Sequence, residues 1–303
     1  MKGLRAKILI NAAAREGFDQ TRRRRLMEIF ATAGATADVQ VGTTAAEVSN
    51  LAQAAATEDY DVVVAGGGDG TVSLVASALI GTGKHFGVLP LGTLNHFAKD
   101  LQIPIDFDQA AENLLSGSPV EVDVAEVNER FFLNNSSLGL YPTIVHEREK
   151  QQRLGSGKWP AFIWASITAL RRYPFVDVQV TVDDKLLTRR TPFVFVANND
   201  YLMESFNIGR RQRLNGGELC LYMTKQMSRL GLVRLALRAL FGRLRDDKDF
   251  LAMRAQAVTI QTRTKRLRVA MDGEVEVITT PLEYKIRPGA LSVIVPAPKR
   301  NED

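Results

Sequence analysis

Short apolar runs alternate with helical patterns over the N-terminal part of the chain. Four runs are typical of buried strands, at residues 6–10, 39–41, 62–65 and 86–89. A helix is predicted over 20–33, with one apolar face formed by Leu26, Ile29, Phe30 and Ala33. Thr44 and Glu47 have the spacing of a capping box and predict a second helix to about residue 56. Alternating strands and helices indicate a parallel sheet covered by helices.

After about residue 120, the pattern changes to strands in which every second residue is apolar. These strands are predicted at residues 120–127, 130–134, 176–182, 192–197, 219–223, 258–262, 267–271 and 275–279. Three residue pairs between the runs are typical of hairpins or turns: Asp183-Asp184, Asn215-Gly216 and Asp272-Gly273. Because the chain is long for one core, we predict an α/β domain over 1–122 and a β-rich domain over 123–303, with the extreme C-terminus free to return to the first domain.

A glycine-rich segment directly follows the apolar run 62–65. It consists of Gly66, Gly67, Gly68, Asp69, Gly70 and Thr71, and a helical pattern over 72–79 comes after it. Glycines let the backbone approach a ligand closely, and the N–H groups at a helix start favour an anion. A carboxylate would repel a bare phosphate, so Asp69 favours a divalent cation beside the phosphate. The alternative is a tight strand-to-helix turn that binds nothing.

A second polar loop follows the apolar run 86–89. It contains Gly92, Thr93 and Asn95 and again precedes a helical segment. Ligands of open α/β sheets bind at the carboxyl ends of the strands, so the two loops are expected to line one pocket. Taken alone, the second loop is more typical of a plain strand-to-helix turn with Asn95 near a helix cap.

Composition and charge favour an anionic partner without choosing one. The 303 residues are 45% hydrophobic and carry a formal net charge of +5, which suits nucleotides, nucleic acids and acidic lipid surfaces alike. A single cysteine, Cys220, excludes an internal disulfide and fits a reducing cytoplasm. No export signal is visible at the N-terminus, and the apolar stretch 159–170 is shorter than the roughly 20 residues that span a bilayer.

Two helix candidates interrupt the β-rich half, over 159–173 and 228–245. Basic residues flank the first, and the second carries Arg234, Arg238 and Arg245 beside a row of leucines. Basic amphipathic helices of this kind bind anionic membranes. Alternatively, each helix packs its apolar stripe on a core while its arginines are solvated. DNA binding is less well supported, because no nucleic-acid module is recognised.

Four stretches together resemble the diacylglycerol kinase catalytic-domain family, especially the soluble bacterial lipid kinases related to sphingosine kinases. They are residues 67–71, 87–98, 134–139 and 272–274, and the similarity spans nearly the whole chain. The first stretch is also similar to NAD kinases and phosphofructokinases, but the second separates the chain from both. The resemblance implies an α/β N-terminal domain with an NAD kinase- or phosphofructokinase-like parallel sheet, a β-sandwich-like C-terminal domain, and an active site between them.

The resemblance also implies an ATP site in the N-terminal domain. ATP would lie on residues 66–71, with Asp69 near Mg²⁺. The second loop would contribute Gly92, Thr93 and Asn95. Asn11, at the end of the first predicted strand, matches an asparagine of the family, whereas residues 12–15 depart from the family's pattern.

The catalytic residues implied by the resemblance are Asp272 and Glu274. Asp272 would be the general base that takes the proton of a lipid hydroxyl, and Glu274 would support it. On the residues alone, Asp272-Gly273 between two alternating runs is typical of a tight hairpin with a structural role.

Two further positions depart from the family's pattern. Similar enzymes hold a structural Mg²⁺ at an Asp-rich turn of the second domain, whereas here residues 214–220 contain one carboxylate, Glu218. His96 stands where many relatives have Asp.

The sequence therefore favours an ATP-dependent lipid kinase that acts on diacylglycerol or a similar lipid in phospholipid biosynthesis. We expect a cytoplasmic protein that contacts an anionic membrane peripherally and binds no nucleic acid; a homodimer is compatible with the sequence. A kinase of a soluble substrate such as NAD and a non-catalytic nucleotide or lipid sensor remain alternatives. Acyl-chain pockets consist of ordinary apolar residues, so the sequence does not identify the lipid.

Overall fold

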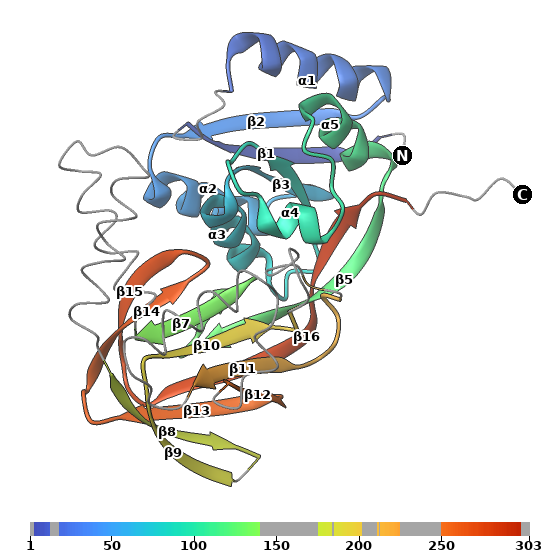
Figure 1. Ribbon diagram of the computed structural model, residues 1–303. Coiled ribbons are helices and arrows are strands. Elements are labelled where there is room, and N and C mark those ends of the chain that lie inside the picture. Colours follow the sequence, from blue (N-terminus) through green and yellow to red (C-terminus); the bar gives the residue numbers. More distant parts are fainter. Residues whose placement is uncertain are drawn as a thin grey trace, which may run out of the picture. The chain divides into compact units, whose positions relative to one another are not determined.

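The computed structural model describes residues 3–12, 18–139, 175–183, 185–201, 211, 213–224 and 250–297. The helices predicted over 159–173 and 228–245 lie outside these residues. The chain divides into two compact units, one formed by residues 1–123 with 289–303 and the other by residues 124–288 (Figure 1). Among the described residues, no helix is long and apolar enough to cross a membrane.

The first unit contains a parallel sheet in the order β2, β1, β3, β4. Its elements are β1 (Arg5–Asn11), α1 (Gln20–Thr32), β2 (Thr36–Gly42), α2 (Ala45–Thr57), β3 (Val62–Gly67), α3 (Asp69–Leu79), β4 (His85–Pro90), α4 (His96–Asp100), α5 (Phe107–Ser116) and the first part of β5 (Ser118–Val127). The last part of β16 (Leu282–Val295) extends the sheet, because Ser292 and Val293 pair in parallel with β4. This alternation confirms the α/β prediction.

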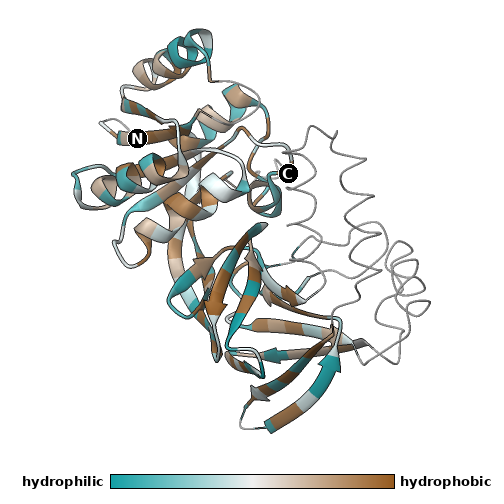
Figure 2. Ribbon diagram, turned by 90° about the vertical axis from the view of Figure 1, so that its left-hand side faces the viewer, coloured by the Kyte–Doolittle hydropathy of each residue, from teal (hydrophilic) through white to brown (hydrophobic). Residues whose placement is uncertain are grey.

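The core of the first unit lies on both faces of this sheet. Helices α1 and α5 cover one face and α2 and α3 the other (Figure 1). On α1, Leu26, Ile29 and Phe30 are buried as predicted, while Ala33 is exposed because the helix ends before it. The helices carry both hydrophilic and hydrophobic residues, as expected for elements with one buried side (Figure 2).

The start of α2 confirms the predicted cap and gives a stability prediction. The Thr44 hydroxyl accepts the Glu47 N–H at 3.1 Å, and the Glu47 carboxylate accepts the Thr43 N–H and hydroxyl. These bonds to Thr43 lower the pKa of Glu47. Thr44→Ala should lower the free energy of unfolding by about 1 kcal/mol, because a donor at the helix start loses its acceptor.

Urea denaturation of Thr44→Ala measures this loss. The matched control is Thr57→Ala at the other end of α2, where the hydroxyl donates to the Ala54 carbonyl at 3.0 Å. The control should change the free energy of unfolding by less than about 0.5 kcal/mol. Equal effects of the two substitutions would contradict a capping role for Thr44.

The second unit is a β-sandwich, as the family resemblance implies, and its strands confirm the β-rich domain that the apolar pattern predicts. One sheet has the order β16, β13, β8, β9, with β5 beside β16 and β6 beside β5, and the other has the order β12, β11, β10, β7, β14, β15. The strands are β6 (Arg130–Phe132), β7 (Asn135–Gly139), β8 (Val176–Val182), β9 (Lys185–Thr191), β10 (Phe193–Asn198), β11 (Leu219–Thr224), β12 (Phe250–Ala255), β13 (Ala257–Thr262), β14 (Arg266–Met271) and β15 (Glu274–Thr279).

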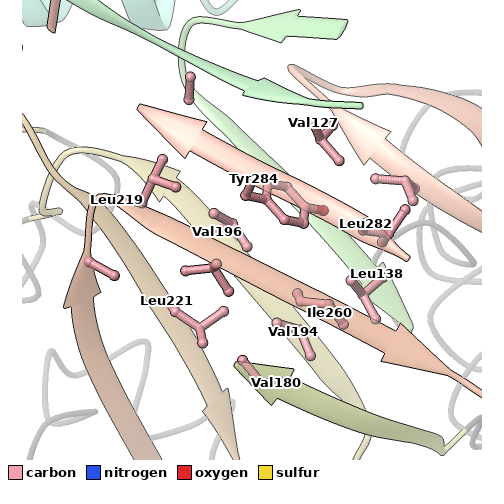
Figure 3. Packing of buried hydrophobic residues seen from close by; sticks show 14 of the residues in the cluster. Val127, Leu138, Val180, Val194, Val196, Leu219, Leu221, Ile260, Leu282 and Tyr284 are labelled. Atoms are coloured by element: carbon pink, nitrogen blue, oxygen red, sulfur yellow. The ribbon is translucent and has the colours of Figure 1, made fainter. Parts of the chain in front are cut away.

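Side chains from both sheets form one core in the second unit (Figure 3). Val180, Ile260 and Tyr284 come from the first sheet. Val196 and Leu221 come from the second. Their burial removes apolar surface from water, which favours the sandwich.

Four strands of this unit were absent from the prediction: β7, β9, β12 and β16. In β7, Ser136 and Ser137 are polar although both are buried, so the alternating apolar pattern is missing. In β16, Pro288 and Gly289 interrupt the run. Both strands hold their place through pairing with neighbours distant in sequence, which a local pattern does not reveal.

Candidate active site

The glycine-rich segment forms a shorter turn than predicted. β3 continues to Gly67, because Gly66 pairs with Leu89 and Gly67 with Pro90 of β4. Gly68 is the N-cap residue and α3 already begins at Asp69, so the predicted loop over 66–71 and helix start at 72 are wrong in extent. Asp69, Gly70 and Thr71 therefore form the first turn of α3, where helix N–H groups lack partners within the helix.

Glycine is required in this region by close packing rather than by an unusual backbone angle. A Cβ on Gly67 would lie 2.5 Å from the Thr71 hydroxyl oxygen. A Cβ on Gly92 would lie 2.4 Å from the Cα of Gly68. The two glycine loops thus touch backbone to backbone, and neither Gly67 nor Gly92 has a positive φ.

Asn95 shapes the second loop. It is buried and adopts the left-handed conformation with φ 51°. Its side chain accepts the Gly92 N–H at 3.1 Å and donates to the Gly92 carbonyl at 2.8 Å. Asn95 precedes α4, as expected of a cap position, but its side chain makes no capping bond there and instead closes the loop around exposed Thr93.

Hydrogen bonds join the two loops to each other and to β1. The Asp69 carboxylate accepts the Phe97 N–H at 3.3 Å, and the Leu91 N–H donates to the Gly67 carbonyl at 3.0 Å. Asn11, the last residue of β1, donates to the Thr71 hydroxyl at 2.9 Å. The structure therefore gathers every predicted residue of the first unit at the carboxyl ends of β1, β3 and β4. We call this set the carboxyl-end cluster: Asn11, residues 66–71, Gly92, Thr93 and Asn95.

The chemistry of the carboxyl-end cluster suits a metal-bound polyphosphate. The N-terminus of α3 carries partial positive charge, and Gly68 provides no side chain that caps it. Asp69 is partly exposed at the same turn. Mg²⁺ is commonly held by one or two carboxylates together with the phosphates of a substrate. Helix N–H donors beside one carboxylate match that donor set.

In the second unit, Asp272 and Gly273 form the hairpin turn that the residues alone predicted. Met271 of β14 pairs with Glu274 of β15, leaving a two-residue loop. Both loop residues have positive φ, 46° at Asp272 and 90° at Gly273, as a type I′ turn requires. Glu274 is exposed and begins β15 immediately after the turn.

The Asp272 carboxylate has a specific set of partners beyond the turn. It accepts the backbone N–H groups of Leu133 at 2.8 Å, Asn134 at 2.8 Å and Asn135 at 3.1 Å. The Asp272 N–H in turn donates to the Asn135 carbonyl at 2.9 Å. Asp272 is thus held by the segment that leads into β7, and two stretches that the family resemblance singled out separately come into contact.

Sequence reasoning missed the buried polar residues behind this segment. Asn198, at the end of β10, donates from its side chain to the Leu133 carbonyl at 2.8 Å, and Arg211 donates to the side chain of Asn134 at 2.8 Å. All three polar side chains are buried. The signal in the sequence was the pair Asn198-Asn199 directly after an apolar run, since polar residues at the end of a buried strand need partners.

Residues 214–220 do not fit the structural Mg²⁺ site of similar enzymes. The Glu218 carboxylate lies 3.4 Å from the Arg254 guanidinium, which also binds the Asp200 carboxylate at 2.6 Å. Asn199 binds the Gly216 N–H and the Glu218 carbonyl. Across the described part of the chain, no group of three His, Cys, Asp or Glu side chains could hold a metal ion. A guanidinium is thus the cation beside these carboxylates.

This arrangement predicts that residues 214–220 hold no stabilising Mg²⁺ in the nucleotide-free protein. The melting temperature should therefore differ by less than about 1 °C between excess Mg²⁺ and EDTA, because an ion that does not bind this segment cannot stabilise it. Arg254→Gln should lower the free energy of unfolding by no more than about 1 kcal/mol, since the pairs are partly exposed. Differential scanning fluorimetry measures both. A rise of several degrees with Mg²⁺ in the wild type would contradict the prediction.

Each of the two units matches the model of a known protein family. Residues 5–127 match the family model of the diacylglycerol kinase catalytic domain, and residues 141–295 match that of the YegS C-terminal NAD kinase beta sandwich-like domain. A diacylglycerol kinase of Bacillus subtilis strain 168 is 24% identical over 273 residues, covering 89% of each chain. A diacylglycerol kinase of Staphylococcus aureus strain RF122 is 24% identical over 225 residues, covering 74% of this chain and 71% of that protein.

A solved structure shares the fold. The crystal structure of a diacylglycerol kinase from Bacillus anthracis strain Sterne has a TM-score of 0.73 at 19% identity, covering 97% of this chain and 98% of that chain. The family model that residues 5–127 match is that of a kinase catalytic domain, so the class of the protein is a phosphotransferase. The chain belongs to the diacylglycerol kinase catalytic-domain family, and the resemblance seen in the sequence is confirmed.

Proposed function

We propose that this protein is an ATP-dependent lipid kinase that transfers the γ-phosphate of ATP to a hydroxyl of diacylglycerol or a similar lipid. The observation that carries the proposal is that this chain, a member of the kinase family, fixes the Asp272 side chain by hydrogen bonds. Its carboxylate is fixed by three backbone N–H groups in the second unit. The carboxyl-end cluster in the first unit supports the same function, and the names of the bacterial relatives support a lipid acceptor.

The carboxyl-end cluster would hold the nucleotide. N–H groups of the first turn of α3 would bind phosphate oxygens, and Asp69 would be the protein ligand of Mg²⁺. When bound, Mg²⁺ neutralises negative charge on the phosphates during transfer. Asn11 keeps Thr71 in place through its 2.9 Å hydrogen bond. Asn95 keeps Gly92 in place, so the phosphate-facing backbone is ordered before ATP binds.

Asp272 would act as the general base. Its carboxylate takes the proton of the lipid hydroxyl while that oxygen forms a bond to the γ-phosphorus. The bond between the γ-phosphorus and the bridging oxygen of ATP breaks at the same time, and ADP leaves. Glu274, which follows the turn immediately, would support Asp272 in the proton transfer. Phosphoryl transfer needs mainly alignment and charge neutralisation, so these groups are sufficient.

Contact with a membrane is part of the proposal, because the lipid substrate must be drawn from one. The net charge of +5 favours an anionic surface. The basic helices predicted over 159–173 and 228–245 are the segments proposed to make this peripheral contact.

A lipid-panel assay tests the proposed function. The protein is incubated with Mg²⁺ and γ-labelled ATP in mixed micelles, each containing one lipid with a free hydroxyl, and the organic phase is counted. Label in the organic phase with diacylglycerol or a related lipid is the expected result. Label found only in NAD, supplied in a parallel reaction, would overturn the lipid assignment in favour of a soluble substrate. No transfer to any acceptor, together with retained ATP or lipid binding, would favour a sensor.

A further inference from the structure

Arg211 is a buried arginine in the second unit, and three of its hydrogen bonds go to residues 133, 134 and 198. Its side chain is 5% exposed. One terminal nitrogen donates to the Leu133 carbonyl at 2.5 Å and to the Asn198 carbonyl at 3.3 Å. The other donates to the Asn134 side-chain oxygen at 2.8 Å. The guanidinium is therefore fixed against the segment that precedes β7.

The same segment binds Asp272 through different groups. The acceptors of Leu133 and Asn134 take hydrogen bonds from Arg211, whereas the N–H groups of residues 133–135 donate to the Asp272 carboxylate. The segment is thus hydrogen-bonded to a guanidinium through its oxygens and to a carboxylate through its nitrogens. A shift of the segment away from Arg211 would displace the donors that fix Asp272.

Asn198 and Tyr201 also contact Arg211 or residues 133–134 and help to fix their positions. Asn198 donates through its N–H to the Asn134 carbonyl at 3.0 Å and through its side chain to the Leu133 carbonyl at 2.8 Å. The ring of Tyr201 lies 5.8 Å from the Arg211 guanidinium carbon, within the range of a cation–π contact. Residues 201 and 211 also form a backbone bridge.

Arginine suits this position for a geometric reason. Its planar fork presents several donors at fixed angles, so one side chain can bind two carbonyls and an amide oxygen together. Lysine carries the same charge but only one nitrogen, at the end of a flexible chain. A buried charge is costly to desolvate, and an apolar side chain would fill the space without that cost. The guanidinium of Arg211 offsets this cost by ordering residues 133–135 through several hydrogen bonds.

We propose that Arg211 is a positioning residue for Asp272: it orders residues 133–135, and their N–H groups then hold the carboxylate at the angle needed to take the proton of the acceptor hydroxyl. The inference rests on the proposed function for the role of Asp272. The ordering of the segment itself is independent of that role.

The test compares Arg211→Lys and Arg211→Met with Arg130→Met in the full chain. Arg130 is an exposed arginine of the same unit, paired with Glu276 at 2.8 Å, so its removal is a matched loss of a guanidinium. Amide hydrogen exchange by NMR reports the N–H groups of residues 133–135, with Leu221 in β11 as an internal reference. Steady-state kinetics with the lipid accepted by the wild type give kcat and the KM for ATP.

In both Arg211 variants, exchange at residues 133–135 should rise at least about tenfold while Leu221 is unchanged, because local opening becomes easier. The kcat should fall about 10- to 100-fold with the KM for ATP within about twofold, since a small misplacement of a reacting group is costly. Arg130→Met should change neither. If Arg211→Met melts below the assay temperature, Arg211→Lys alone gives the result.

Unchanged exchange at residues 133–135 in Arg211→Lys would overturn the inference, as would wild-type kcat in that variant despite faster exchange. If Arg211→Lys keeps both the exchange rates at residues 133–135 and the kcat near the wild-type values, a positive charge alone is sufficient at this position, and the inference is overturned. Failure of the proposed function is distinguished by Asp272→Asn. If that variant keeps wild-type kcat, Asp272 is not the base, and the exchange data still decide whether Arg211 orders the segment.

Discussion

Asp272→Asn is expected to lower kcat by about 10²- to 10⁴-fold, the usual contribution of a general base. Asparagine matches the shape of aspartate but cannot take the proton of the acceptor hydroxyl. The KM for ATP should change little, because the proposed ATP-binding residues lie in the other unit. Kinetics with γ-labelled ATP and the lipid identified by the panel measure both constants.

The same substitution also has a structural effect that must be separated from catalysis. Three N–H groups donate to the Asp272 carboxylate, and the amide nitrogen of asparagine would face at least one of them. Loss of such a bond costs about 1 to 3 kcal/mol of stability, so kcat is measured well below the melting temperature of the variant. Asp183→Asn is the matched control, because Asp183 follows β8 with the same φ of 46°. A folded Asp272→Asn protein with kcat within about threefold of the wild type would contradict the assignment.

Gly92→Ala is expected to lower the free energy of unfolding by about 2 kcal/mol or more and to weaken ATP binding at least about tenfold. The added Cβ would lie 2.4 Å from the Gly68 Cα and 2.7 Å from the Asn95 side-chain oxygen. The first contact is with backbone, which cannot rotate away, so the two loops must separate. That separation would move the backbone at the start of α3 and weaken phosphate binding.

Gly68→Ala is the matched control for Gly92→Ala. It adds a methyl group from the opposite side of the same contact, but its Cβ would lie an ordinary 3.4 Å from the Gly92 Cα. Its melting temperature should stay within about 2 °C of the wild type, because no overlap must be relieved. Scanning calorimetry and isothermal titration with Mg-ATP measure the two effects. Equal melting temperatures for the two variants would contradict the role assigned to the loop contact.

Much of the fold was predictable because it depends on local sequence. The runs 6–10 and 62–65 are buried strands, as their apolar composition indicates. Thr44 caps α2, and Asp272-Gly273 forms the two-residue hairpin that this pair favours. The strand β16 escaped prediction because its pairing with β4 and β13 depends on partners far along the chain.

The candidate site was predictable in its residues but not in its connections. The family motifs indicated Asp69, Asn95 and Asp272 by resemblance. Their positions follow from longer-range contacts: the Asp69 carboxylate reaches Phe97, and Asp272 reaches residues 133–135, more than a hundred positions earlier. Arg211 carried no local signal, because it lies outside both the quoted motifs and the periodic strands.

The sequence by itself determined the alternation of strands and helices in the first unit, the Asp272-Gly273 hairpin and the family of the protein, since apolar periodicity, turn propensity and motif spacing are properties of neighbouring residues. Only the tertiary structure decided that Gly92 must be glycine because of Gly68, that a guanidinium pairs with Glu218, and that Arg211 and Asp272 bind one segment. These features depend on atoms brought together by packing across the sheets. Such contacts form only when distant parts of the chain fold onto one another.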